Sequence, residues 1–187
     1  WLQVMVGYAM QPHIGAVGAK LLYSDNTVQH AGIILGIGGI AQHCFIDNPR
    51  EDVGFYGRLS VPFNYSAVTA ACLMVSKEKY LEVNGLEEDL QVAFNDVDFN
   101  LKLLKQGYYN ICLNQVELYH YESKSRGMEN TLDKIDRFNH EIELFQNRWS
   151  DILKDGDPFY NPNFTFAFVQ TLFSSCLKHT LLFDDTR

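Results

Sequence analysis

Two pairs of carboxylates with the spacing Asp-x-Asp are the residues best suited to chemistry, namely Asp96/Asp98 and Asp155/Asp157. Carboxylates bind divalent cations or act as general acids and bases. Residues two apart on a helix point to nearly opposite sides, so Asp96 and Asp98 would not chelate one metal ion from inside a helix. If Asp96 lies at a helix N-terminus, its carboxylate either caps the helix or faces a crevice at the carboxyl ends of strands. Asp155 and Asp157 lie in a Gly/Pro-rich stretch that is typical of a turn.

The histidines offer a second set of candidates. His120 follows a predicted strand and precedes a polar segment that contains Glu122 and Arg126. A histidine at a strand end can ligate a divalent cation, and an arginine can pair with phosphate or carboxylate. The alternative is a polar loop with a surface histidine. His30 and His43 lie in or beside a glycine-rich stretch without the GxGxxG pattern, and the chain has neither the HExxH spacing of zinc proteases nor a GxSxG nucleophile motif.

Strand and helix patterns alternate around these candidates. Apolar runs predict extended segments over 14–23, 28–36, 67–75 and 108–119, of which the first two form a hairpin. Helical spacing of apolar residues predicts helices over 1–9, 77–83, 96–106 and 135–152. An aromatic-rich irregular loop is expected over 43–66. We therefore expect an α/β fold in which helix 96–106 packs on one face of a sheet.

Composition limits the class of protein. The 187 residues, 47% of them hydrophobic and 20% charged, are enough for one globular domain with a sizeable core. The net charge of −8 argues against a broad nucleic-acid-binding surface. No apolar run is long enough for a transmembrane segment, and no signal peptide is visible. The four cysteines form no CxxC pair, so we expect buried free thiols and a reducing compartment. Because the chain begins with Trp, we expect it to be a piece of a longer protein.

Several segments together resemble the second half of a family 2 glycosyltransferase. They occur in the order and with the gaps of the rhamnosyltransferase-like and polysaccharide-building bacterial members, and they cover 1–36, 66–88, 92–127 and 157–165. The most telling motifs are FNDVD at 94–98 and LYHYES at 118–123. The resemblance implies a GT-A fold, here a partial Rossmann-like sheet without its N-terminal half. It divides the chain into an acceptor-side part, 1–163, and a C-terminal tail, 164–187.

The resemblance also implies roles for single residues. Asp96 matches the general base of an inverting transfer, and Asn95 stands where the family often has Glu. Thr69, Asn95 and Arg126 are expected to contact substrate, and His120 to help bind a metal–diphosphate. The implied cofactor is Mg²⁺ or Mn²⁺. The implied partners are a nucleotide-sugar donor and a glycan or lipid-linked acceptor, on the cytoplasmic side and peripheral to the inner face of the membrane.

The donor-binding Asp-x-Asp of the family lies before the segment that matches residue 1, so the chain is expected to be inactive alone. An exposed strand edge and apolar surface then predict self-association, most simply as a two-fold dimer. Two other interpretations stay open. One is a non-catalytic carbohydrate-binding or interaction domain that uses the aromatic loop 43–66. The other is a metal-dependent hydrolase built on His30, His43, Asp96 and His120.

Overall fold

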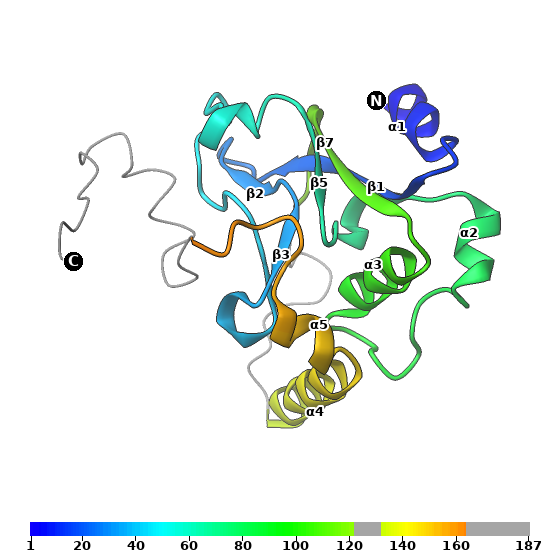
Figure 1. The fold of residues 1–187 in the computed structure, drawn as a ribbon. Coiled ribbons are helices and arrows are strands. Elements are labelled where there is room, and N and C mark those ends of the chain that lie inside the picture. Colours follow the sequence, from blue (N-terminus) through cyan, green and yellow to red (C-terminus); the bar gives the residue numbers. More distant parts are fainter. Residues whose placement is uncertain (122–131, 164–187) are drawn as a thin grey trace, which may run out of the picture.

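A computed structural model of the chain describes residues 1–121 and 132–163. Within these ranges α-helices flank a mixed sheet, which confirms the expected α/β class (Figure 1). The central strand is β1 (Ile14–Leu22), which runs parallel to β7 (Tyr109–Tyr119). Because β1 and β7 are parallel, their carboxyl ends lie at the same edge of the sheet.

Shorter strands complete the sheet on both sides of this parallel pair. β2 (Val28–His30) and β6 (Leu73–Met74) pair antiparallel with β1, and β5 (Pro62–Tyr65) pairs antiparallel with β7. β3 (Ile33–Leu35) and β4 (Ala41–His43) form a separate two-stranded sheet. The sheet is therefore mixed, with its parallel pair in the middle.

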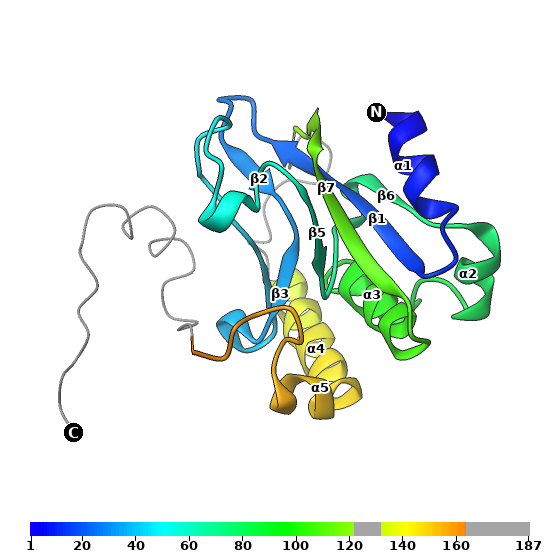
Figure 2. The same ribbon diagram turned by 45° about the horizontal axis from the view of Figure 1, so that its top comes forward.

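The helices cover both faces of the sheet. In chain order they are α1 (Leu2–Ala9), α2 (Lys77–Glu82), α3 (Asn95–Lys105), α4 (Leu132–Arg148) and α5 (Ser150–Asp155). Figures 1 and 2 show α1 on one side of β1 and β7, α3 on the other side, and α4 beyond α3. Short 3₁₀ turns lie at η1 (Ile37–Gly39), η2 (Phe55–Gly57) and η3 (Ala70–Cys72). The predicted helices over 1–9, 77–83 and 96–106 are thus confirmed to within a residue or two at their ends.

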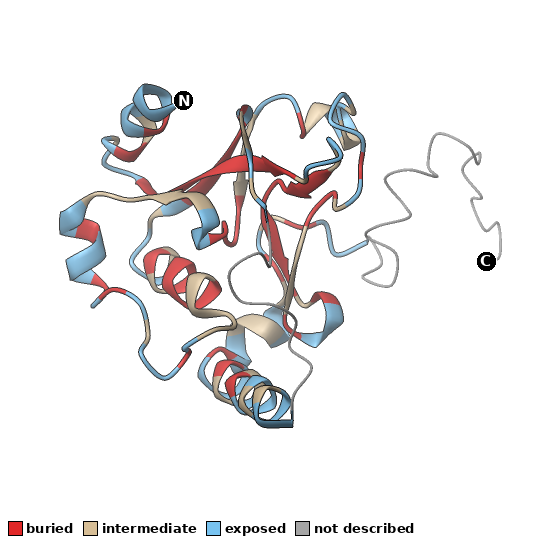
Figure 3. Ribbon diagram, turned by 180° about the vertical axis from the view of Figure 1, so that it is seen from behind, coloured by how far each residue is buried: buried red, intermediate tan, exposed pale blue. Residues whose placement is uncertain are grey.

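Packing follows from the alternation of side chains along β1. Every residue of β1 is buried, as expected of a strand covered on both faces. Ala16 and Leu22 join a core cluster with Phe99 of α3, whereas Val17 packs in a second cluster with Met5 of α1. Figure 3 shows buried residues along the central strands and the inner face of α3, while α1 and α4 are largely exposed.

One strand prediction was wrong over most of its length. Of residues 67–75, only Leu73 and Met74 pair as a strand, and η3 lies before them. The main chain of Val68 is bonded by a side chain instead: the Asn100 amide donates to the Val68 carbonyl at 3.0 Å, and the Val68 N–H donates to Asn100 Oδ1 at 3.2 Å. An apolar run in the sequence does not show whether a buried main chain is hydrogen-bonded to a neighbouring strand or to a side chain.

Three boundaries also differ from expectation. The extended segment 28–36 is interrupted at Gly32, whose φ is +114° and where a Cβ would lie 2.4 Å from the Tyr65 ring. The expected loop 43–66 contains η2 and β5. The expected helix 135–152 is two helices, α4 and α5, with Trp149 at the junction.

The prediction of buried free thiols is confirmed for Cys44 and Cys112. Cys44 and Cys112 are buried, Cys72 is half-buried, and all three are free, whereas Cys176 lies outside the described residues. Burial raises the pKa of all three thiols, which keeps them protonated. Within residues 1–121 and 132–163, no helix has the length and apolar character needed to cross a membrane.

Candidate functional site

A polar cavity of about 220 Å³ lies at the carboxyl ends of the two parallel strands. Tyr23 directly follows β1 and His120 directly follows β7, and both side chains line this polar cavity. The remaining lining residues come from β2, β4 and the segments beside β4 and η3; they are Gln29, His43, Ile46, Thr69 and Ala71. Ligands of open α/β sheets bind at this edge, so the position favours a functional site.

Gln29 links two of the histidines. The His120 Nδ1 lies 2.8 Å from the Gln29 side-chain Oε1, and the His43 Nδ1 lies 3.2 Å from the Gln29 backbone oxygen. Gln29 itself is only 3% exposed. One buried residue therefore contacts the same ring atom of two histidines that line the polar cavity.

His30 lies directly behind this pair. Its ring is fully buried and meets the His43 ring edge to face, with centroids 4.7 Å apart. The Thr69 N–H donates to His30 Nε2 at 3.4 Å. Burial, and then the charge of His43, hold the pKa of His30 well below its usual value, so the ring is neutral. His30 is a packed core histidine that supports Thr69.

Asp96 lies in the first turn of α3, beside η3. Its Oδ2 accepts the Ala70 N–H at 3.1 Å, and Ala70 lies between Thr69 and Ala71, which both line the polar cavity. The N-cap position is Phe94, so Asp96 is not the helix cap that the sequence offered as one alternative. Phe94 has a φ of +61°, a costly conformation for a bulky residue, and such strain often marks functional segments. The turn at Phe94 directs the Asp96 carboxylate toward the loop that carries Thr69.

Asp98 has the opposite environment, as the spacing predicted. Its side chain is fully buried, and Oδ1 accepts the Trp149 indole N–H at 2.9 Å and an Arg148 guanidinium N–H at 3.1 Å. Lys102 pairs with the other oxygen at 3.0 Å. Asp98 therefore holds α3 against the α4–α5 junction.

Of the second pair, Asp155 is the last residue of α5, so the turn prediction was wrong for it. Asp157 does lie in a turn, where its Oδ1 accepts the Phe159 N–H at 2.8 Å and its Oδ2 accepts the Leu35 N–H of β3 at 2.7 Å.

Two of the predicted site residues, Thr69 and His120, line the polar cavity, whereas Asp96 does not line it and bonds Ala70, the residue next to Thr69. Asn95 is half-buried next to Asp96 and is not among the residues that line the polar cavity. Arg126 lies outside the described residues. Sequence reasoning missed Gln29, because a glutamine within a short strand carries no motif; its one signal is a polar side chain between two buried neighbours.

Two imidazoles, those of His43 and His120, line the polar cavity. Among the described residues there is no group of three or more His, Cys, Asp or Glu side chains that could hold a metal ion. The four residues of the hydrolase interpretation therefore do not form a metal centre. His43 and His120 fit a cation only as two of its ligands, and Mg²⁺ or Mn²⁺ would take the oxygen ligands it prefers from elsewhere, a diphosphate for example.

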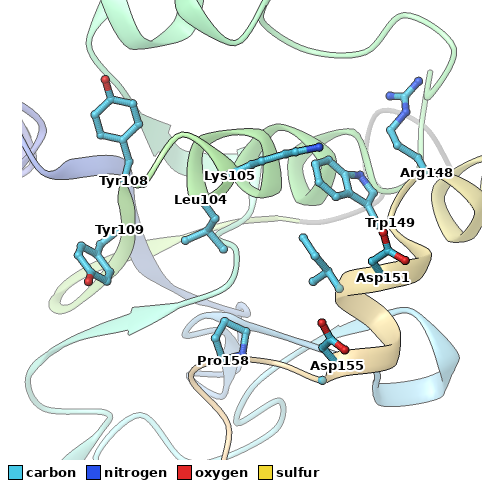
Figure 4. Close-up of a pocket in the computed structure, with 12 residues that line it drawn as sticks. Leu104, Lys105, Tyr108, Tyr109, Arg148, Trp149, Asp151, Asp155 and Pro158 are labelled. Carbon is cyan, nitrogen blue, oxygen red and sulfur yellow. The ribbon is translucent and has the colours of Figure 1, made fainter.

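A second cavity, the apolar groove, lies at the other end of α3. It has a volume of about 560 Å³ and runs between the end of α3 and α5 (Figure 4). Leu104, Ile152 and Pro158 supply apolar lining, and Lys105 and Asp155 lie at its sides. None of the residues that the sequence singled out for catalysis or binding lines it.

Comparisons with known proteins add two relatives. The chain is 47% identical over 164 residues to the uncharacterized protein y4gI of Sinorhizobium fredii, which covers 87% of this chain and 18% of that protein. It is 36% identical over 175 residues to the O-antigen biosynthesis protein RfbC of Myxococcus xanthus, which covers 89% of this chain and 13% of that protein. The chain thus spans less than a fifth of the length of either relative. No protein-family model and no solved structure matches it.

Proposed function

We propose that this chain is the acceptor-side part of a GT-A glycosyltransferase of polysaccharide biosynthesis. In this proposal the enzyme transfers a sugar, with inversion, from a nucleotide-sugar donor to a glycan or lipid-linked acceptor. The observation that carries the proposal is the position of Thr69 and His120 in one cavity at the carboxyl edge of β1 and β7, with Asp96 bonded to Ala70 beside Thr69. Similarity to a protein named for O-antigen biosynthesis supports the pathway class. The small share of each relative that the chain spans supports a longer enzyme.

Asp96 is the proposed general base. Inverting transfer needs a carboxylate that accepts the proton of the acceptor hydroxyl as the new glycosidic bond forms. The Asp96 Oδ2 accepts the Ala70 N–H at 3.1 Å and its Oδ1 accepts the Val97 N–H at 2.9 Å, and among the described residues no ion pair of the kind that holds Asp98 engages this carboxylate. Each carboxylate oxygen has a further lone pair that can accept a hydrogen bond from a hydroxyl. The Ala70 hydrogen bond orients the carboxylate without removing its charge.

The polar cavity is the proposed site of the donor diphosphate. A bound Mg²⁺ or Mn²⁺ would stabilise the negative charge of the leaving diphosphate. His120 and His43 are the residues of this chain that would hold it. Thr69, whose N–H is engaged by His30 and whose hydroxyl accepts from Ala71 N at 3.4 Å, shapes the wall toward Asp96. The donor-binding Asp-x-Asp is assigned to residues outside this chain.

Replacement of the base tests the proposal. In the full-length protein with Mn²⁺ and a panel of nucleotide sugars, Asp96→Asn should lower turnover about 10²- to 10⁴-fold. Asn retains an acceptor for the Ala70 N–H, so the thermal midpoint should change little. Asp133→Asn is the matched control, because Asp133 is also an aspartate in the first turn of a helix but is exposed on α4. Turnover near wild type in Asp96→Asn would contradict the assignment.

Self-association of the 187-residue piece stays a prediction. Apolar side chains of α1 and its flanks are 42–74% exposed, and they are Trp1, Leu2, Val4, Val6 and Met10. An exposed apolar surface of this kind favours association. Light scattering across the micromolar range should detect a dimer, and Val6→Lys should weaken it. A strictly monomeric piece would contradict this prediction without affecting the proposed chemistry.

A further inference from the structure

We infer that Asn100 is a positioning residue that fixes the Asp96 carboxylate against the loop that carries Thr69. The inference rests on the proposed function, in which Asp96 is the general base, and it names the residue that orients this base. Asn100 lies four residues after Asp96 on α3 and is completely buried. A buried side-chain amide must find partners for both its NH₂ group and its oxygen.

The side-chain amide of Asn100 bonds two segments of main chain at once. Its Nδ2 donates to the Val68 carbonyl at 3.0 Å and to the Asp96 carbonyl at 2.7 Å, and its Oδ1 accepts the Val68 N–H at 3.2 Å. Both hydrogens of the amide and its oxygen are therefore used. The reversed amide would place its NH₂ against an N–H and its oxygen against two carbonyls. The three contacts thus fix one orientation of the amide and hold Val68 beside the first turn of α3.

The same two segments form the hydrogen bond that orients the Asp96 carboxylate. The Ala70 N–H, two residues after Val68, donates to Asp96 Oδ2 at 3.1 Å. Val68 and Thr69 lie between β5 and η3, and Asn100 links this part of the loop to the main chain of α3. Because Asn100 ties Val68 to Asp96, a shift of Val68 would move the Ala70 donor away from the carboxylate. The position of the carboxylate relative to the loop therefore depends on Asn100.

A second buried amide holds Asn100 in place. Asn110 of β7 is completely buried, and its Nδ2 donates to the Asn100 carbonyl at 2.9 Å and to the Ser66 carbonyl at 3.0 Å. Its Oδ1 accepts the Ala16 N–H of β1 at 3.0 Å. The loop and α3 are therefore both bonded to a side chain of the central parallel pair. A functional group is held precisely when its supporting residues are themselves fixed by packing and hydrogen bonds on rigid elements.

Asp98 shows the contrasting case of a buried polar residue on α3 that serves only the packing of helices. It is equally buried, but its partners are the Trp149 indole and the Arg148 guanidinium at the α4–α5 junction. The partners of Asn100 are instead main-chain atoms on both sides of the Ala70–Asp96 bond. Misplacement of a reacting group by about 1 Å can cost about 10²-fold in rate, so bonds that fix a general base affect turnover as well as stability.

Amide hydrogen exchange of the full-length protein, resolved to single amides by mass spectrometry, tests the inference without any sugar. Asn100→Ser shortens the side chain and removes its NH₂, and it should speed exchange of the Ala70 amide about 5- to 10-fold, the factor that corresponds to loss of one hydrogen bond. Asp96→Ala removes the acceptor of the Ala70 N–H and should have the same effect. In the double variant the Ala70 amide should exchange no faster than in either single variant, because both changes remove the same bond.

Asn139→Ser is the matched control, because it makes the same change at an exposed position of a helix, α4. It should leave exchange of the Ala70 amide unchanged. Asn100→Asp is the second variant, to be used if circular dichroism shows that Asn100→Ser does not fold. It retains the acceptor of the Val68 N–H and loses both donors, so it should speed exchange at Ala70 while the Val68 amide stays protected.

Turnover of the full-length protein with nucleotide sugars gives a second readout. Asn100→Ser should lower kcat about 10- to 100-fold with little change in KM, because the base is misplaced while substrate contacts remain. It should cause no further loss of kcat in Asp96→Asn, in which the base is already absent. A purely structural role would lower kcat by the same factor with and without Asp96.

Two results would overturn the inference: an unchanged exchange rate of the Ala70 amide in a folded Asn100 variant, or equal losses of kcat with and without Asp96. If the wild-type protein transfers no sugar, the proposed function fails. The exchange experiment still decides in that case whether Asn100 positions Asp96, so the two failures are distinguishable.

Discussion

The two cavities differ in how their polar groups are used. Two residues that line the apolar groove belong to a partly buried network: Arg148 pairs with Glu87 at 2.6 Å and with Asp98, and the Trp149 indole donates to Asp98. In the polar cavity, Gln29 contacts the Nδ1 atom of both His43 and His120. The apolar groove is the larger of the two cavities, yet none of the residues singled out for catalysis or binding lines it.

Cavity size is therefore a poor guide to function in this fold. The apolar groove exists because α4 and α5 meet at Trp149, and the ion pairs of Asp98 lock that junction. The polar cavity exists because two parallel strands end together and carry polar residues past their ends. Asp96 and Asp98 lie two residues apart on α3, yet one contacts the loop of the polar cavity and the other supports the apolar groove.

The largest stability effect should come from the buried network behind the apolar groove. Asp98→Ala should lower the free energy of unfolding by roughly 3 kcal/mol, because it removes the buried partner of an ion pair and leaves the Trp149 N–H unbonded. Asp96→Ala should cost about 1–2 kcal/mol, because it removes the two hydrogen bonds that a half-buried carboxylate accepts from the Ala70 and Val97 N–H groups. Urea denaturation of both variants measures the difference. Equal costs would remove the distinction between the two carboxylates.

An intermediate effect should follow from pH at the buried histidine behind the polar cavity. The pKa of His30 is depressed in the folded chain, so the unfolded chain binds more protons at mildly acidic pH. Stability should be complete above about pH 6.5 and should fall by about 1.4 kcal/mol per pH unit below it, until the folded ring itself protonates.

His30→Gln isolates this contribution, because Gln can accept the Thr69 N–H but does not titrate. Urea denaturation at several pH values between about 5 and 8, the range in which histidines titrate, measures this contribution. The free energy of unfolding should depend less on pH in the variant than in the wild type. Burial raises the pKa of Asp157, which acts in the opposite sense at the acidic end. Asp157 is present in both proteins, so its contribution cancels when the pH–stability profile of His30→Gln is subtracted from that of the wild type. If the free energy of unfolding depended on pH equally in the wild type and in His30→Gln, His30 would not be the source of the pH dependence.

The smallest effect is expected at the side of the apolar groove. Lys105→Ala removes an exposed side chain near the end of α3 and should change the free energy of unfolding by less than about 0.5 kcal/mol. Sugar transfer and Mn²⁺ binding by the full-length protein should be unchanged, since the polar cavity is formed by other elements. A marked loss of transfer in this variant would make the apolar groove a substrate site and reverse the comparison.

Much of the fold could be predicted from local patterns. The long buried run of β1 and the apolar stripe of α3 are strong signals, and Ser76 marks the start of α2, where its hydroxyl accepts the Lys79 N–H at 3.3 Å. The signal failed at 67–75, where Asn100, distant in sequence, bonds the backbone of Val68. It also failed at Trp149, whose indole bond to Asp98 accompanies the break between α4 and α5.

The sequence by itself determined the α/β class, the opposite faces of Asp96 and Asp98, and the placement of His120 at a strand end, because these follow from periods of 2 and 3.6 residues along one segment. Only the tertiary structure decided that Thr69 and His120 line one cavity and that Asp96 bonds the main chain beside Thr69, since these residues come from three elements. It also decided that Gln29 contacts the Nδ1 atom of both His43 and His120. The Gln29–His120 contact spans 91 residues of chain, and no local pattern encodes a hydrogen bond at that separation.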